Sequence, residues 1–298
     1  MKYSEETLQS WTARLSQSEE ERVERTKRMI SEAINANDEL SCVDYEIFVQ
    51  GSYANNTNVR QYSDIDICIM LTSTFYTNYP DGITSSDFGY TDGSMSFQDF
   101  RSYVLDALLK KFGSENVVRK NKCIHIYSNS YHVNADVVPA LLYKDYRIIN
   151  SRNKNRFVEG IKYYAQDGTC VINYPKDHIN NGKRKNNDTN YKYKKLVRIM
   201  KHLTNNMIGE GLINGDIISS FLVECLVWNV PNSYITKHDT WNATIQDTIA
   251  YLWNAINDHD VSEWREVSER LYLFRNRKWT DIDAQNYLRK MYVYLEYE

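Results

Sequence analysis

Two aspartates separated by one residue lie at the start of an apolar segment, and their side chains are suited to binding a metal ion. Asp64 and Asp66 alternate with Ile65 and Ile67, so a strand would place both carboxylates on one face and both isoleucines in the core. Two carboxylates held side by side repel each other unless a cation lies between them. Oxygen ligands favour Mg²⁺ or Mn²⁺ over zinc. The pair therefore predicts a divalent-metal site.

The residues that precede this pair have the composition of a strand followed by a tight turn. Residues 45–49 are rich in β-branched and aromatic side chains, which indicates a strand. Gly51 adopts backbone angles that other residues avoid, and it leaves room for a ligand to approach. Ser52 and the polar residues after it would open a short helix whose free N–H groups attract an anion. We therefore expect Gly51 and Ser52 to contact a phosphate.

An Asp-x-Asp pair alone is usually a capped or solvated turn, but the spacing in this chain is more specific. Gly51-Ser52, eleven intervening residues and then Asp64-x-Asp66 resemble the signature of the DNA polymerase β-like nucleotidyltransferase superfamily. A later segment, in which Asp136 is followed by Val-Val-Pro-Ala, looks like the third-carboxylate strand of that superfamily.

The segment around Asp136 resembles one branch of the superfamily more closely than the others. This branch is the CD-NTases, the bacterial cyclic-oligonucleotide synthases related to cGAS and to oligoadenylate synthase. Residues 193–201 and 219–231 are similar to further blocks of the same family, in the expected order. The chain is therefore identified, by resemblance, as a member of the CD-NTases.

The resemblance implies an α+β fold with two lobes. The first, over residues 1–160, would be a polymerase β-like catalytic core of mixed sheet and flanking helices, with a long N-terminal spine helix. The second, over residues 161–298, would be an oligoadenylate-synthase-like helical lobe that carries a nucleotide lid and a triphosphate clamp.

The resemblance also implies roles for the acidic and polar residues. Asp64 and Asp66 would hold two Mg²⁺ ions, with Mn²⁺ as a possible substitute. Asp136 would bind the ion that activates an attacking ribose hydroxyl. Ser52 and Ser220 would contact the donor triphosphate.

A cationic stripe is expected on the helix that begins near residue 191. Lys194, Arg198 and Lys201 follow the i, i+4, i+7 spacing that places side chains on one helix face. Such a stripe is usually a solvated surface. The family resemblance implies a triphosphate clamp instead, with Lys194 as the best match to the phosphate-binding lysine.

The implied reaction joins nucleoside triphosphates (ATP, GTP, UTP or CTP) into a cyclic di- or trinucleotide second messenger, with release of pyrophosphate, in bacterial anti-phage signalling. Implied partners are an effector that reads the product and a regulatory protein from the same operon. Two alternatives remain open. The acceptor could be an RNA end, a protein or a small-molecule hydroxyl, or the chain could be a catalytically silent nucleotide sensor.

Composition excludes several other classes of protein. The formal net charge is −3, so the chain is not a general nucleic-acid binder, and no sequence-specific nucleic-acid partner is expected. Its five cysteines form no C-x-x-C pair, which argues against a zinc site and a disulfide framework. No apolar run is long enough to cross a bilayer and no signal peptide is recognisable, so we expect a cytoplasmic protein without a membrane partner.

Periodicity predicts most of the helices and strands. A long helix is expected over residues 4–37, and a second over residues 97–112 with Gly113 as its C-terminal cap. Residues 117–126 and 131–142 are expected to pair as two strands, with His132 beside Asp136 but outside the metal site.

The C-terminal half is expected to be mostly helical after a loop. Residues 167–190 are expected to form this loop, which is either a solvated surface loop or a polar lid over a nucleotide base, and the family resemblance supports the lid. Helices are expected over residues 243–257, 260–275 and 281–296. The last should begin with a capping box, in which Thr280 is the N-cap and Asp283 lies three residues on.

Overall fold

The chain divides into two compact units, each of which is described by itself. The computed structural model describes residues 2–59, 64–258 and 261–297. The sheet unit comprises Leu15–Ala54 and Asp64–Lys176. The helical unit comprises Met1–Arg14, Asn55–Ser63 and Asp177–Glu298. The boundary expected between residues 160 and 161 falls inside a strand, and the units instead divide at residues 176 and 177.

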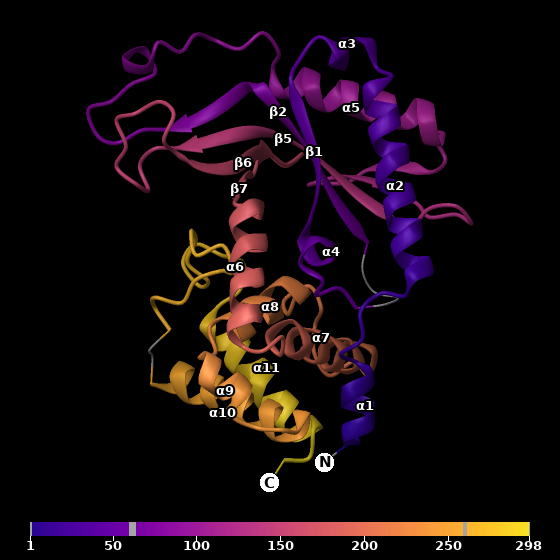
Figure 1. Ribbon diagram of the computed structural model, residues 1–298, viewed down its shortest axis with the longest axis vertical. Helices are drawn as coiled ribbons and strands as arrows, with labels where there is room; N and C mark the ends of the chain where they lie inside the picture. The colour runs from indigo at the N-terminus through magenta and orange to yellow at the C-terminus, as the bar shows by residue number, and fades with distance from the viewer. Residues whose placement is uncertain (1, 60–63, 259–260, 298) are drawn as a thin grey trace. The chain divides into compact units, whose positions relative to one another are not determined.

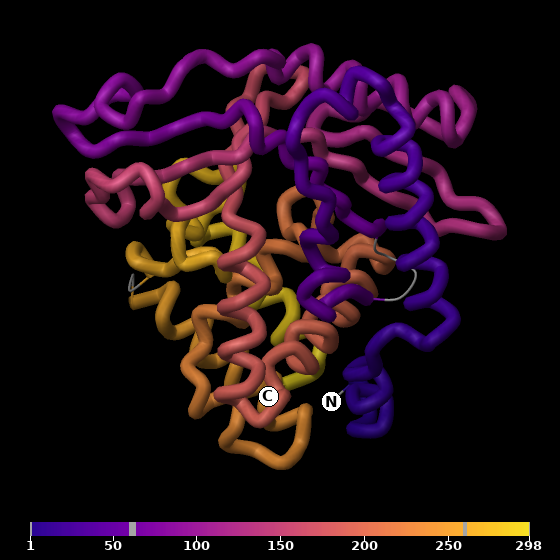
Figure 2. The backbone as a smooth tube through the Cα atoms, turned by 45° about the horizontal axis from the view of Figure 1, so that its top comes forward, coloured from indigo at the N-terminus to yellow at the C-terminus, as the bar shows by residue number. Residues whose placement is uncertain are grey.

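The sheet unit is built on a mixed sheet, as expected. In the described residues the sheet has seven strands: β1 Tyr45–Gln50, β2 Ile65–Asn78, β3 Val117–Arg119, β4 Ile124–Ile126, β5 Ala135–Asp145, β6 Val158–Tyr164 and β7 Cys170–Asn173. The order is β1-β2-β5-β4-β3, and β6 lies between β5 and β7. The long strands β2 and β5 run parallel (Figure 1) and lie side by side (Figure 2), and every other pair is antiparallel.

The parallel pair requires a crossover, and α5 (Phe97–Phe112) lies within it. The predicted helix is confirmed, including the cap, because the Gly113 N–H bonds to the Leu109 carbonyl. α2 (Gln17–Asn35) packs against α5, and the buried side chains of both helices share one core with β2 and β5 (Figure 1). This packing holds the ends of β2 and β5 in a fixed position.

The single N-terminal helix expected over residues 4–37 is wrong. The chain forms α1 (Glu5–Ser10) in the helical unit and α2 in the sheet unit. A new helix begins after Ser16 because Ser16 and Glu19 form a capping box, in which the Glu19 carboxylate accepts the Ser16 backbone N–H at 2.8 Å.

The strand expected over residues 117–126 is also wrong, because the segment folds into the β3–β4 hairpin. Of the two strands of this hairpin, only β4 pairs with β5. The partner expected over residues 131–142 begins later, at Ala135, so His132 lies in the preceding loop. There it is buried and contacts the edge of Phe112.

Helices make up the core of the helical unit. They are α6 Pro175–Asp188, which begins in the sheet unit, α7 Tyr193–Gly209, α8 Ser220–Trp228, α9 Asn232–Thr236, α10 Trp241–Asn257 and α11 Asp281–Tyr294. The last two confirm the helices expected over residues 243–257 and 281–296, and the capping box of Thr280 and Asp283 is present. Short segments near the start of the chain are α3 Asp38–Ser41, α4 Gly51–Asn55 and the 3₁₀ turn η1 Ser86–Phe88.

The helix expected over residues 260–275 is wrong in its described part, residues 261–275. This part consists of turns with an isolated bridge between Arg265 and Tyr272. Glu269 has a φ of 59°, which is incompatible with a continuous helix. Asn229 further holds the segment by donating to the Arg265 carbonyl at 2.8 Å.

The loop expected over residues 167–190 is largely helical or extended, because it contains β7 and α6. Pro175 occupies the first position of α6, where its fixed φ favours a helix start. Neighbouring segments bind the polar side chains of α6: Asn181 donates to the Val267 carbonyl at 2.9 Å and Lys185 to the Val230 carbonyl at 2.7 Å. Tertiary hydrogen bonds therefore stabilise a helix whose composition is typical of a loop.

Within the described residues, no helix is both long enough and apolar enough to span a membrane.

Candidate active site

The structure places the Asp-x-Asp pair at the start of β2, where the sequence predicts it. Asp64 directly precedes the strand and Asp66 is its second residue, opposite Gln50 of β1. Gly51 follows β1 with a φ of 65°. A Cβ atom on Gly51 would clash with the Asp66 carboxylate, so only glycine fits beside this side chain.

Asp136 lies on the neighbouring strand beside the pair. In the parallel register of β2 and β5, Asp136 is the direct partner of Asp66. Asp64 and Asp136 belong to one group of potential metal ligands whose donor atoms all lie within 4.8 Å of one another. The structure therefore brings Asp64 and Asp136 together, whereas Asp66 is the register partner of Asp136 but is not a member of this group.

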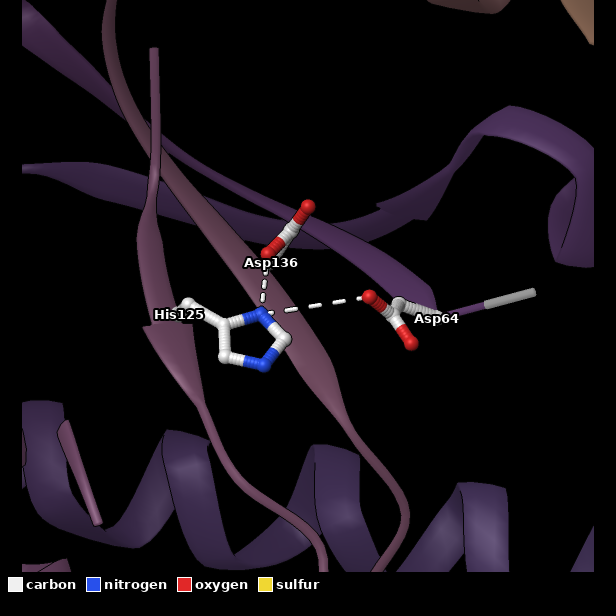
Figure 3. A group of neighbouring side chains, drawn as sticks. All are labelled: Asp64, His125 and Asp136. Atoms are coloured by element: carbon white, nitrogen blue, oxygen red, sulfur yellow. Dashed lines mark hydrogen bonds and ion pairs between the residues drawn. The ribbon is translucent and has the colours of Figure 1, made fainter. Parts of the chain in front are cut away.

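His125 is the third member of this group, and sequence reasoning missed it. It lies on β4 directly opposite Asp136. Figure 3 shows its imidazole pointing toward both aspartates, with Nδ1 2.6 Å from Asp136 Oδ1 and 3.9 Å from Asp64 Oδ2. The alternation of Ile124, His125 and Ile126 is a weak indication of a strand. The register that places His125 opposite Asp136 cannot be derived from that alternation.

The neighbours of these carboxylates lie in a negative electrostatic field. Burial, and next the charge of Asp136, raise the pKa of the Cys123 thiol to about 12. Burial is also the largest cause that raises the pKa of Tyr53, and Asp64 and Asp66 contribute to this increase. The Lys120 ammonium lies 3.7 Å from Asp136, on a side chain that is 45% exposed. A solvated lysine offsets little of this field, so a cation would be stabilised at the site.

The donor set fits a divalent ion. Two carboxylates and one imidazole lie close enough to contact a single ion. The Asp64 and Asp136 side chains are 37% and 26% exposed, so solvent can reach the site. Ser52, the second residue of α4, is half-buried in the turn next to Gly51.

Lys194 lies in α7 of the helical unit and is 6% exposed. Burial, as the largest cause, lowers the pKa of its ammonium to about 8; the charge of Glu224 opposes this shift, and nearby Lys183, Arg14 and Arg198 add to it. Among the described residues, no hydrogen-bond acceptor or ion-pair partner contacts this ammonium. A buried cation among other cations, without a partner of its own, is suited to binding an anion.

The other two members of the cationic stripe are bound to groups of the helical unit itself. Arg198 donates to the backbone carbonyls of Thr12 and Asn56. Lys201 lies 2.6 Å from the buried Glu224 carboxylate, which also accepts from Thr57 at 2.7 Å. Both side chains are 3% exposed, so the stripe is not a solvated surface. Their contacts stabilise the packing of α7.

Ser220 is the first residue of α8 and is exposed. The neighbouring Ser219 is the N-cap, and its hydroxyl accepts the Leu222 N–H. The Ser220 hydroxyl is therefore not the cap of α8.

Comparison with known proteins agrees with this geometry. Residues 28–163 match the nucleotidyltransferase domain, and residues 180–296 match the cGAS/DncV-like nucleotidyltransferase C-terminal helical domain. A cyclic dipyrimidine nucleotide synthase, CdnE of Cecembia lonarensis, is 44% identical over 99% of each chain. A second enzyme of that name, from Legionella pneumophila, is 35% identical over 98% of each chain.

Solved structures agree as well. The CdnE cyclic dinucleotide synthase of Elizabethkingia meningoseptica, with GTP and Apcpp, has a TM-score of 0.82 and 31% identity, covering 99% of this chain and 100% of the other. The CdnE c-UMP-AMP synthase of Rhodothermus marinus, with Apcpp and Upnpp, has a TM-score of 0.86 and 28% identity, covering 99% and 97%. The chain therefore belongs to the cGAS/DncV-like nucleotidyltransferases (CD-NTases), and it is an enzyme of their cyclic nucleotide synthase group.

Proposed function

We propose that this enzyme joins pyrimidine nucleoside triphosphates into a cyclic dinucleotide at the site formed by Asp64, Asp66 and Asp136. The observation that carries the proposal is the close approach of Asp64, the residue before β2, and Asp136 of the neighbouring parallel strand β5. Relatives at 44% and 35% identity are cyclic dipyrimidine nucleotide synthases, which supports UTP and CTP as the substrates.

Each bond-forming step is a nucleotidyl transfer. The ribose hydroxyl oxygen of one nucleotide forms a bond to the α-phosphorus of another, and the bond from that phosphorus to the bridging oxygen breaks. Pyrophosphate leaves with the electron pair, and the hydroxyl proton passes to solvent. The same transfer, repeated within the linear intermediate, closes the ring.

Asp64, Asp66 and Asp136 would hold a divalent ion, Mg²⁺ or Mn²⁺. When bound, such an ion lowers the pKa of the attacking hydroxyl and neutralises charge on the leaving pyrophosphate. The residues of this chain contribute position: β2 and β5 fix the carboxylates, and Gly51 keeps the space beside Asp66 clear.

Phosphate contacts are proposed for Ser52, Lys194 and Ser220. Lys194 is the most strongly supported of these, because its buried ammonium lies among other cations and has no partner among the described residues. Arg198 and Lys201 would act indirectly, by holding α7 in place.

The product would act as a second messenger in bacterial anti-phage signalling. It would be read by an effector protein, and a regulatory protein encoded beside the enzyme would control synthesis. We place the enzyme in the bacterial cytoplasm, which supplies its triphosphate substrates. These proposals are supported by membership in the CD-NTases.

The proposal is tested by supplying labelled ATP, GTP, CTP and UTP with Mg²⁺ or Mn²⁺, treating with phosphatase and separating the products. We expect a phosphatase-resistant product that disappears when UTP and CTP are left out and persists without ATP and GTP. Dependence on a purine nucleotide would overturn the dipyrimidine proposal. Labelled RNA, protein or small molecule in place of a resistant product would identify a different acceptor.

A further inference from the structure

We propose that His125 is a ligand of the divalent ion at Asp64 and Asp136, and that its nitrogen shifts the preference of the site from Mg²⁺ toward Mn²⁺. This inference rests on the proposed function, and it changes the oxygen-only site that the sequence predicts.

The position of His125 Nδ1 between the two carboxylates is the first argument. The atom lies 2.6 Å from Asp136 Oδ1 and 3.9 Å from Asp64 Oδ2 (Figure 3). The two aspartates come from β5 and from the residue before β2, whereas His125 comes from β4. Three separate segments of the sheet therefore direct one donor atom each toward one point, as metal sites require.

The ring is also held rigidly. His125 is 4% exposed at its side chain, is flanked in β4 by the fully buried Ile124 and Ile126, and contacts the edge of Tyr127. In the described residues, its second nitrogen, Nε2, has no hydrogen-bond partner. Packing therefore holds the ring in place with Nδ1 directed toward the carboxylates.

The other buried histidine of the sheet unit provides a comparison. His132 is 2% exposed, and its ring nitrogen lies 3.3 Å from the backbone carbonyl of Val133. Its ring contacts Phe112, a core residue of α5. These contacts explain His132 as a packing residue, whereas His125 faces two acidic side chains.

The chemistry of imidazole determines the expected preference. Mg²⁺ is a hard ion that binds oxygen, whereas imidazole nitrogen suits first-row transition metals. Mn²⁺ accepts both oxygen and nitrogen donors, so a site with two carboxylates and one imidazole should bind Mn²⁺ more tightly than Mg²⁺.

A second role for His125 would also fit the 2.6 Å contact. The ring could only donate a hydrogen bond to Asp136 and orient it, without touching the ion. The variant His125→Asn separates the metal-binding role from the orienting role. The asparagine amide can donate a hydrogen bond near the position of Nδ1, but it is a poor replacement for imidazole as a metal ligand.

The test is pulsed electron paramagnetic resonance of Mn²⁺ bound to the full-length protein with inorganic tripolyphosphate. Tripolyphosphate contains no nitrogen, so a strong ¹⁴N modulation of the Mn²⁺ echo would come from a protein ligand. We expect this modulation in the wild type, its conversion to a ¹⁵N pattern after ¹⁵N-histidine labelling, and its loss in His125→Asn. The control variant His132→Asn should retain it.

Affinity supplies the second readout. We expect His125→Asn to weaken Mn²⁺ binding by about ten-fold and Mg²⁺ binding less, so that the ratio of affinities falls. Absence of histidine modulation in the wild type, or an unchanged ratio in His125→Asn, would overturn the proposal and leave His125 as an orienting residue. Neither readout measures nucleotide turnover, so failure here is distinguishable from failure of the proposed function.

Discussion

Gly51 and the Asp66 carboxylate lie so close together that a methyl group on Gly51 would clash with an Asp66 oxygen atom. Gly51 directly follows β1, whose last residue, Gln50, is the antiparallel partner of Asp66. The close approach explains why a glycine precedes Ser52 in this active site. A side chain there would displace the Asp66 carboxylate.

Gly51→Ala should therefore abolish most nucleotidyltransferase activity. The positive φ of 65° alone costs about 1–2 kcal/mol for alanine, and the clash with Asp66 adds to this. Gly168→Ala is the matched control, since Gly168 has a φ of 83° and an added methyl group would meet no atom within 4 Å. Equal effects of the two variants on product formation and on the melting temperature would mean that only the backbone angle matters.

Loss of the paired carboxylates should remove activity without unfolding the protein. Asp64→Ala with Asp66→Ala removes metal ligands and also relieves repulsion between like charges, so the melting temperature should be unchanged or higher. The control is Asp281→Ala with Asp283→Ala, a second Asp-x-Asp pair in which Asp283 accepts the Thr280 N–H at 2.8 Å. The control should lose about 1 kcal/mol of stability from its helix cap and keep its activity. Activity that survives in the Asp64/Asp66 variant would contradict the site.

Phosphate binding by Lys194 should depend on pH. Burial lowers the pKa of this ammonium to about 8, so it is charged below that pH and neutral above it. The Michaelis constant for the triphosphate should therefore rise between about pH 7 and about pH 9. Lys194→Ala should raise it roughly ten-fold at about pH 7, as expected for the loss of a charge-assisted hydrogen bond, and should flatten the pH dependence. Lys195→Ala, on the same helix, is the control, and an equal effect of both variants would count against a specific contact.

Lys201→Met should strongly destabilise the helical unit. The Lys201 ammonium forms a buried ion pair with Glu224, so its removal leaves the buried carboxylate with only Thr57 and His178 as partners among the described residues, at a cost of about 3–5 kcal/mol. Burial alone would raise the pKa of Glu224, but Lys201 and His178 lower it overall. Because the folded pKa is below the unfolded one, this contribution to stability is present above the unfolded pKa of 4.5 and is lost as the pH falls through the folded pKa.

Denaturant unfolding measures this effect. Adding Glu224→Gln to Lys201→Met removes the buried charge that has lost its lysine partner, so the double variant should be more stable than Lys201→Met alone. A single variant that unfolds at the same denaturant concentration as the wild type would show that the pair contributes nothing measurable.

Elements with local sequence signals were predictable. α5 ends at Gly113, and α11 begins with the capping box of Thr280 and Asp283, so both could be located from sequence. The same kind of signal, Ser16 with Glu19, divides the N-terminal segment into two helices, although its periodicity alone predicts one long helix.

Features that depend on distant contacts were not predictable. α6 has the composition of a loop, and hydrogen bonds from Asn181 and Lys185 to other segments stabilise it. His125 joins the site only because the β3–β4 hairpin sets the register of β4 against β5. The carboxylates, by contrast, could be predicted, because Asp64 and Asp66 share a strand face and the resemblance to a known motif identifies Asp136.

The most direct test of the central claim is the stoichiometry of pyrophosphate release, measured with the mass of the product. If the enzyme closes a ring, one pyrophosphate is released for each nucleotide incorporated, and the product has no terminal phosphate group. Asp136→Asn should release almost none. Release of only one pyrophosphate for each dinucleotide, with a triphosphate retained on the product, would show a linear product and contradict the account.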